Sequence, residues 1–143
     1  MNFDFSQTYL YKMHRLTNSL DKLFDVSLRR YAVIGLSQFT LLLAVSQHKT
    51  ASQRTIASFL GISPGAISRQ VEVAQKQGFI IVQNSTQDRR GQLVSITAKG
   101  QQKITDGITV LEQHVFAIFN DENMQTNLMG HIEKLQENID HTS

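Results

Sequence analysis

Apolar residues recur at helical spacing over about residues 6–30 and again from Ser37 onward. The first stripe contains Tyr9, Met13, Leu16, Leu20 and Leu23, at intervals of four and three residues. A second helix is predicted from Ser37, as its N-cap, to about His48. Its apolar residues surround almost the whole helix, which is typical of the central element of a core.

Two shorter helices are predicted next, joined by a tight turn. Ser52 suits the N-cap of the first, and Gly61 its end. Three apolar residues of this helix are predicted to face inward: Ile56, Phe59 and Leu60. The second helix follows the turn directly, so the pair predicts a helix-turn-helix.

The second of these helices has unusually clear start and stop signals. Ser63 can cap it, Pro64 fits the first helical position, and Gly78 suits its left-handed end. One face is apolar through Ile67, Val71 and Ala74. The opposite face begins with small residues and carries an arginine one turn in: Gly65, Ser68, Arg69. A helix of this kind can approach a groove closely.

A β-hairpin is predicted after Gly78. Residues 79–82 and 93–96 are short runs rich in β-branched or aromatic side chains, which favour strands. The polar segment 83–92 between them carries Asp88, Arg89 and Arg90 near its tip. A two-stranded ribbon with a basic tip beside a helix-turn-helix is typical of a winged helix.

The rest of the chain returns to helical periodicity. Thr97 can cap a helix, and Asn120, Asp121 and Glu122 interrupt its stripe and suit a new helix start. The stripes that flank the middle segment include Leu16, Leu20, Leu111, Val115, Leu128, Ile132 and Leu135. These stripes carry more apolar surface than is needed to cover the middle segment, so pairing between subunits is predicted. A monomeric helical bundle is the alternative.

Composition narrows the class of protein. A chain of 143 residues with 41% apolar and 18% charged residues is expected to fold as one domain. No long uncharged apolar run predicts a membrane span, and the first residues do not resemble a signal peptide, so a cytoplasmic protein is expected. The absence of cysteine excludes disulfides and thiolate metal sites.

Charge is distributed unevenly along the chain. Between Lys49 and Lys103, eight lysines and arginines stand against two acidic residues, a net +6. Residues 104–143 carry a net −6. A basic segment is often only a solvated face, but here it coincides with the predicted helix-turn-helix and wing. That coincidence favours a polyanionic partner such as double-stranded DNA.

The ordered series of motifs resembles the multiple-antibiotic-resistance regulator (MarR) family of bacterial winged-helix transcription factors. The resemblance rests on Leu36-Ser37-Gln38-Phe39, the segment from Ile56 to Ser63, Ile67-Ser68-Arg69, Gly78-Phe79-Ile80, Asp88-Arg89-Arg90, and the segment from Val94 to Gly100. It implies a mainly α fold with a small β-hairpin wing. It also implies a homodimer whose two lobes read a pseudo-palindromic operator.

Candidate DNA contacts lie on the recognition helix and on the wing. Arg69 is suited to guanine or phosphate, and a surface ion pair with Glu72 is the alternative. Ser63, Pro64, Gly65 and Ser68 surround the helix N-terminus, which attracts phosphate, although Ser63 also serves as a cap. Arg89 and Arg90 are predicted to reach a minor groove.

Three further charged residues have less specific roles. Asp88 would repel phosphate, so it is predicted to orient an arginine or hold the wing turn rather than to contact DNA. Arg54 and Lys76 are candidate phosphate contacts, with solvated surface as the alternative for both.

Ligands, metals and catalysis leave weaker signals. By the resemblance, Tyr9, Met13, Phe39 and Leu43 are candidates to line a pocket for a small aromatic or anionic ligand; a plain core is the alternative. Five histidines (His14, His48, His114, His131 and His141) form no close i, i+4 pair, so no metal site is expected. No nucleophile–base pairing, glycine-rich phosphate loop or cluster of carboxylates indicates an enzyme.

The sequence therefore predicts a single domain over 1–143, with a winged-helix lobe at about 36–97 and dimerisation helices at about 6–30 and 98–140. The predicted function is a DNA-binding transcriptional regulator. Repression is favoured over activation, because a bound dimer blocks a promoter without further contacts. A winged-helix module that binds proteins without specific DNA binding is the alternative, because fold does not determine function.

Overall fold

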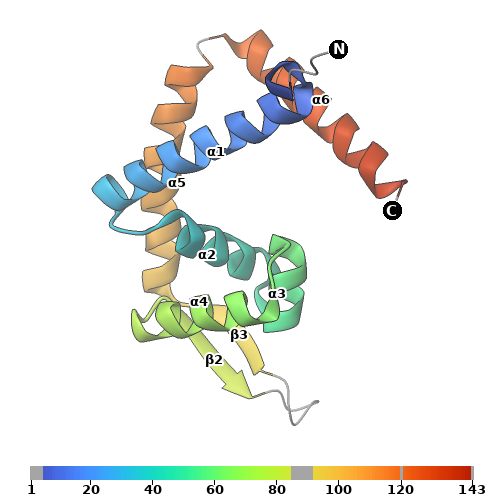
Figure 1. Cartoon of the computed structure of the whole chain (residues 1–143). Helices are drawn as coiled ribbons and strands as arrows, with labels where there is room; N and C mark the ends of the chain where they lie inside the picture. The colour runs from blue at the N-terminus through green and yellow to red at the C-terminus, as the bar shows by residue number, and fades with distance from the viewer. Residues whose placement is uncertain (1–4, 85–91, 120, 143) are drawn as a thin grey trace. The chain divides into compact units, whose positions relative to one another are not determined.

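The structure, a computed structural model, describes residues 5–84, 92–119 and 121–142. The chain divides into two compact units, Met1–Leu111 and Glu112–Ser143. Helices dominate, and a small antiparallel sheet lies in the first unit (Figure 1). The predicted fold class, mainly α with a small β wing, is confirmed.

The elements follow in this order: η1 (Phe5–Gln7), α1 (Tyr9–Ser27), the π-helical turn η2 (Leu28–Ala32), α2 (Leu36–His48), β1 (Thr50–Ser52), α3 (Gln53–Leu60), α4 (Pro64–Lys76), β2 (Ile80–Asn84), β3 (Gln92–Ile96), α5 (Ala98–Ile118) and α6 (Glu122–Asp140). The helix predicted over about 6–30 is therefore interrupted at both ends. The Thr8 side chain caps α1, and Val33 ends the π-helical turn in the left-handed region, at φ 54°. A β-branched residue rarely adopts that conformation, so the connection to α2 is strained.

The predicted N-cap of α2 is wrong. Ser37 already lies inside the helix, and the cap position belongs to Gly35, whose residue type offers no side-chain acceptor. Instead Asp25 accepts a hydrogen bond from the Leu36 backbone N–H through Oδ1, at 2.8 Å. The helix is thus capped by a carboxylate from α1, a contact across 11 residues that local sequence rules do not detect.

The helix-turn-helix is confirmed as predicted except at Phe59. Ser52 accepts from the Thr55 N–H at 3.1 Å, and Gly61 ends α3 at φ 64°. The Phe59 side chain was predicted to face inward but is 55% exposed, and its ring meets the His48 ring edge-on at 5.3 Å. In this eight-residue helix Ile56 and Ala57 occupy the buried face.

The sheet has three strands, one more than the predicted hairpin. β2 pairs with β3 antiparallel from Ile80 opposite Ile96 to Asn84 opposite Gln92. β1 adds to the other edge of β3, with Ala51 opposite Val94. This strand of three residues carries no alternating pattern long enough to predict it, so only the tertiary pairing identifies it.

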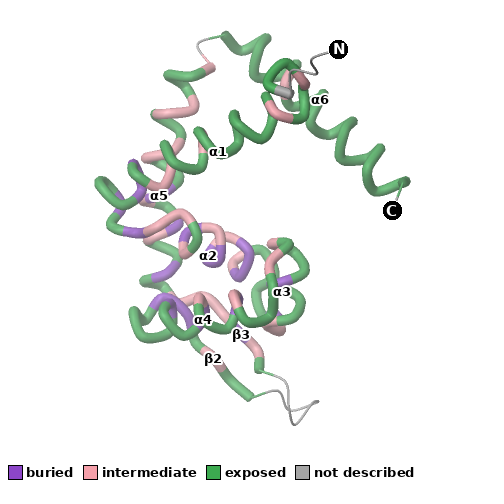
Figure 2. Tube along the Cα trace, in the orientation of Figure 1, coloured by how far each residue is buried: buried purple, intermediate pink, exposed green. Residues whose placement is uncertain are grey.

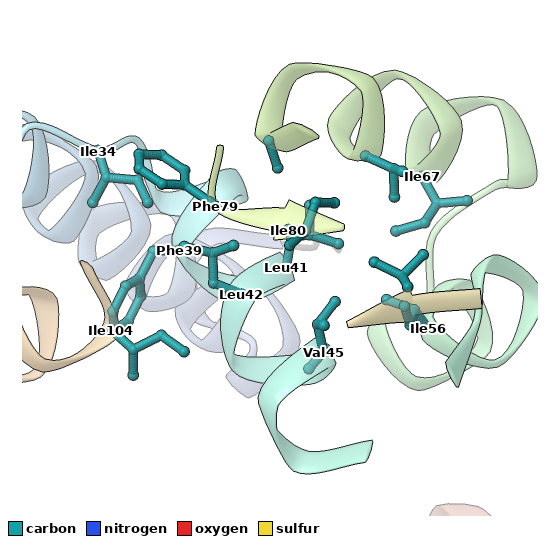
Figure 3. Packing of buried hydrophobic residues seen from close by; sticks show 14 of the residues in the cluster. Ile34, Phe39, Leu41, Leu42, Val45, Ile56, Ile67, Phe79, Ile80 and Ile104 are labelled. Atoms are coloured by element: carbon teal, nitrogen blue, oxygen red, sulfur yellow. The ribbon is translucent and has the colours of Figure 1, made fainter. Parts of the chain in front are cut away.

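The core forms around α2, as its all-round apolar character predicted. Leu41, Leu42 and Val45 are completely buried, and Ile56 and Ile67 pack into the same cluster from α3 and α4 (Figure 3). The remaining buried apolar residues of the cluster are Leu28, Ala32, Ile34, Phe39, Ala44, Ala51, Ala57, Val71, Ala74, Phe79, Ile80, Val94 and Ile104. This cluster holds the helix-turn-helix rigidly against the sheet.

The α6 helix differs sharply from α2 in burial. Asp121 caps it by accepting from the Asn123 N–H at 2.9 Å, as the predicted helix start requires. None of its residues is buried, and α1 is likewise exposed along most of its length (Figure 2). Among the described residues no single helix is long and apolar enough to cross a membrane. The segment Tyr9–Ala32 meets the requirement for length and apolarity only together with α2, from which it is bent by 83°.

Candidate nucleic-acid interface

The recognition helix α4 is built from local signals. The Ser63 hydroxyl accepts from the Ala66 N–H at 3.3 Å, and Pro64 occupies the first helical position. Ile67 and Val71 lie on the buried face. Gly78 follows the C-cap at φ 73°, as predicted. One face of α4 is therefore held in the core and the opposite face is free to meet a partner.

The exposed face begins with an unobstructed first turn. Gly65, Ser68 and Arg69 are all exposed, and a Cβ added at Gly65 would meet no atom within 4 Å. The first backbone N–H groups of a helix carry partial positive charge and attract anions. Small side chains here allow a surface to approach these groups closely. Pro64 is exposed at the same end.

Glu72 pairs with Lys76 rather than with Arg69. The Lys76 Nζ lies 2.6 Å from Glu72 Oε1, and the donated hydrogen bond holds the pKa of the Glu72 carboxyl below its ordinary value. Within the described part of the chain Arg69 has no ion-pair partner. Its guanidinium is available for a ligand, while the Lys76 charge is partly neutralised. Since this pair is solvent-exposed, it competes only weakly with a phosphate.

Arg54 lies beside the N-terminal end of α4. It is exposed in the first turn of α3 and borders a hollow of about 340 Å³ that also touches Pro64 and Ile67. The full lining is Gln53, Arg54, Ala57, Ser58, Ile62, Pro64 and Ile67. The turn thus brings Arg54 and the α4 N-terminus, separate in sequence, to one surface.

A second hollow, of about 290 Å³, separates α4 from the strands. It is lined by Gln53, Ser68, Val71, Glu72, Gln75, Val82 and Gln92, and Gln53 Nε2 donates to Gln92 Oε1 at 3.1 Å. Sequence reasoning missed the three glutamines. Amide side chains can donate to and accept from base edges. Nothing in their local pattern distinguishes them from solvated residues, so only the fold identifies them.

The predicted wing tip lies outside the described residues. Asp88, Arg89 and Arg90 all fall in 85–91. On the described side of the tip, Asn84 and Gln92 are paired across the two strands. The hairpin that should carry the tip is therefore present.

The four predicted pocket residues lie in different surroundings. On α1, Tyr9 is 81% exposed and Met13 is half-exposed. Phe39 is buried, and its ring packs so closely on Gly107 that a Cβ added there would collide with it. Leu43 is half-buried against the core. Phe39 has the surroundings of a core residue, whereas Tyr9 is largely exposed.

Apolar residues predicted at a subunit interface remain partly uncovered in each unit. In the first unit Leu16 is exposed and Leu20 and Leu111 are half-buried. In the second, Val115 and Leu128 are half-buried, and Ile132 and Leu135 are exposed.

The sequence predicted no metal site at the histidines. His14 Nε2 lies 3.0 Å from Asn18 Nδ2. Over the described residues, no group of three histidine, aspartate or glutamate side chains is arranged to hold a metal ion.

Comparisons with known proteins agree with the fold. Residues 34–91 match the model of the MarR family. An uncharacterised HTH-type transcriptional regulator of Bacillus subtilis, YdcH, is 28% identical over 102 residues, which are 68% of this chain and 69% of YdcH.

Two solved structures illustrate the likeness in fold. One is a mutant of Escherichia coli MarR in complex with operator DNA, with a TM-score of 0.77 and 18% identity over 93% of this chain and 99% of that one. The other is Bordetella bronchiseptica BpsR, described with the regulation of its DNA binding by 6-hydroxynicotinic acid. Its TM-score is 0.82 at 17% identity, covering 95% of this chain and 98% of BpsR. The chain therefore matches the MarR family model through the segment that holds its helix-turn-helix, and it shares the fold of these two solved structures.

Proposed function

We propose that the chain is a DNA-binding transcriptional regulator that reads a pseudo-palindromic operator as a homodimer. The observation that carries this proposal is the free outer face of α4, with its open first turn and unpaired Arg69 within the described residues. The net positive charge between Lys49 and Lys103 supports it, because a basic segment attracts the phosphate backbone whatever the base sequence. The predicted single-domain organisation over 1–143 is part of the proposal.

In this proposal the recognition helix enters the major groove with its N-terminal end first. Ser63 and Gly65 bring backbone N–H groups to a phosphate, the small Ser68 side chain allows close approach, and Arg69 reaches a guanine edge or a second phosphate. Arg54 adds a phosphate contact from α3. Arg89 and Arg90 at the wing tip enter the neighbouring minor groove, oriented by Asp88.

The experiment is a titration of a fluorescent duplex that the full-length protein has itself selected from a randomised double-stranded pool. Arg69→Ala should weaken binding by about tenfold or more, the range for losing one bidentate base contact. Arg90→Ala should abolish detectable binding at moderate salt. Arg30→Ala removes the same charge from an exposed position on η2 and should change the affinity less than about twofold.

Salt dependence completes the test. When affinity rests on phosphate contacts, its logarithm falls linearly with the logarithm of the salt concentration. Wild-type affinity that is equal at low and high salt, or a pool from which no sequence is enriched, would refute the proposed function.

Dimerisation is proposed from the apolar residues that a single chain leaves uncovered on α1 and α6. Leu135→Asp should shift the protein from dimer to monomer in sedimentation, because a charge at this position would have to be buried in the interface. Asn127→Asp adds the same charge to an exposed polar site on α6 and should leave the dimer intact. Wild-type protein that sediments as a monomer at micromolar concentration would contradict the proposal.

Repression and ligand control are the finer parts of the proposal. A dimer bound within a promoter prevents polymerase from binding there, so a reporter driven by the selected sequence should be silenced when the protein is present. BpsR supports a search for small aromatic or anionic effectors. An effector that acts through the protein should change its affinity for the selected duplex, since coupling between two sites is reciprocal.

A further inference from the structure

The C-terminal end of the recognition helix is closed by the side chains of Thr97, just before α5, and Lys99, in its first turn. Within α4 itself, Gly78 N–H donates to the Gln75 carbonyl and Phe79 N–H to the Ala74 carbonyl, both at 2.9 Å. These two bonds form the usual closure of a helix that ends in a left-handed glycine. They leave the carbonyls of residues 77–79 to be satisfied from elsewhere.

Residues 97–99 supply those partners. Lys99 Nζ donates to the Gln77 carbonyl at 2.7 Å. The Thr97 hydroxyl lies 2.8 Å from the Gly78 carbonyl and 3.0 Å from that of Phe79, and the Thr97 N–H also donates to Phe79. The Lys99 ammonium further lies 5.2 Å from the centre of the Phe79 ring. A cation at the negative end of a helix dipole is favourable.

One turn further along α5, a second lysine makes the equivalent contact with a different helix. Lys103 Nζ donates to the Ala32 carbonyl at 2.7 Å, at the end of the π-helical turn that follows α1. The side chains of residues four apart lie on one face of a helix. Lys99 and Lys103 therefore attach one face of α5 to the C-terminal ends of both α4 and the α1 segment, and all of these residues lie in the same compact unit.

We infer that Lys99 and Lys103 are positioning residues that hold the recognition helix in a set orientation relative to the first helix. This inference rests on the proposed function, in which α1 pairs with a second subunit and α4 reads DNA. Two half-sites are read together only if the spacing and direction of the two recognition helices match them. A looser attachment of α4 lowers affinity without removing any contact with DNA.

The position of Lys99 argues against a phosphate contact of its own. It lies at the carboxyl end of the 13-residue α4, about 20 Å along the helix axis from the N-terminal turn at 1.5 Å per residue. Its ammonium is already bound to a carbonyl.

The test compares Lys99→Met and Lys103→Met with Lys99→Arg and with Lys134→Met, an exposed lysine on α6. Methionine keeps most of the apolar stem and removes the donor and the charge, whereas arginine keeps both. Binding to the duplex selected by the wild-type protein should weaken about three- to tenfold in each of the first two variants. Lys99→Arg should recover most of the affinity, and Lys134→Met should match wild type.

Two readouts separate positioning from contact. The slope of log affinity against log salt should be unchanged in Lys99→Met; a slope smaller by about one phosphate contact would overturn the inference, because Lys99 would then bind DNA directly. Amide hydrogen exchange over residues 73–79 should be faster in Lys99→Met and unchanged in Lys134→Met.

The exchange measurement needs no DNA, so it remains decisive if the proposed function fails. Wild-type protein that binds no duplex would refute the proposed function, while faster exchange in Lys99→Met would still support its role in holding α4. Exchange and affinity both equal to wild type would overturn the inference.

Discussion

Gly100, the third residue of α5, packs against Phe79, which follows the recognition helix. Gly100→Ala should disrupt this packing. A Cβ built on Gly100 would lie 2.2 Å from the Phe79 carbonyl oxygen and 2.6 Å from Ile96 Cδ1. Ordinary carbon–oxygen contacts begin near 3.3 Å. Because the nearest atom belongs to the backbone, it cannot move aside by changing a rotamer, and α5 must shift by about 1 Å.

The cost follows from what that shift disturbs. Overpacking of this kind costs about 1–3 kcal/mol. The shift also weakens the bond from the Thr97 N–H to Phe79 and the bond from the Gly100 N–H to the Thr97 hydroxyl, both at 3.0 Å and each worth about 1 kcal/mol. Replacing glycine by alanine in a helix returns about 1 kcal/mol. If the two weakened bonds lose about half of their contribution, the net loss in free energy of unfolding is about 1–3 kcal/mol.

The assay is urea denaturation followed by circular dichroism at one protein concentration, since dimerisation would make the midpoint concentration-dependent. With a slope near 2 kcal/mol/M, the midpoint of Gly100→Ala should fall by about 1 M with the slope unchanged. Gly65→Ala is the matched control, because its Cβ meets open space in the same unit, and its free energy of unfolding should equal that of wild type or exceed it by up to about 1 kcal/mol. A Gly100→Ala midpoint equal to or above wild type would refute the packing argument.

Three further variants test separate features. Glu72→Gln should raise affinity for the selected duplex about two- to fivefold in the fluorescence titration, because the outer face of α4 loses a negative charge and Lys76 its partner; weaker binding would mean that the carboxylate itself reads a base. Asp25→Asn tests the carboxylate whose pKa is lowered by its hydrogen bond from Arg29. A lowered folded-state pKa stabilises the fold above the unfolded value near 4, and the contribution is lost as pH falls through the folded value. The variant should thus be slightly less stable than wild type at pH 7 in urea denaturation, and the difference should shrink as the pH falls below about 4; a difference that stays constant in acid would contradict this. Ile67→Ala should lower the free energy of unfolding by about 2–5 kcal/mol in denaturant, since Ile67 is 1% exposed, and a loss below 1 kcal/mol would show that α4 is not anchored in the core there.

Features that depend on neighbours within one helical turn could be predicted from the sequence. Ser52 and Ser63 cap the helices for which they were predicted, and Asp121 caps a helix in the segment predicted as a helix start. Gly61 and Gly78 end helices in the left-handed conformation that glycine adopts without strain. The apolar face of α4 and the central place of α2 also follow directly from periodicity, because burial of a stripe needs no knowledge of what covers it.

Features that join distant parts of the chain could not be predicted in this way. Asp25 caps α2 in place of Ser37, and β1 joins the sheet by pairing with β3. In the candidate interface, Arg69 was predicted as available and is unpaired within the described residues, whereas the glutamines beside Ser68 were missed. An amide side chain has no periodic signature, so its role depends entirely on which element lies opposite.

The sequence by itself determined where the recognition helix begins and ends and which of its faces is buried. Each of these depends on the chemistry of a cap, a proline, a glycine or a repeated apolar residue. Only the tertiary structure decided how that helix is held, with Lys99 and Thr97 bonded to carbonyls 18 to 22 residues earlier and Gly100 pressed against Phe79. The physical reason is that unsatisfied carbonyls at a helix end must be paired, but the sequence does not state which distant donor will reach them.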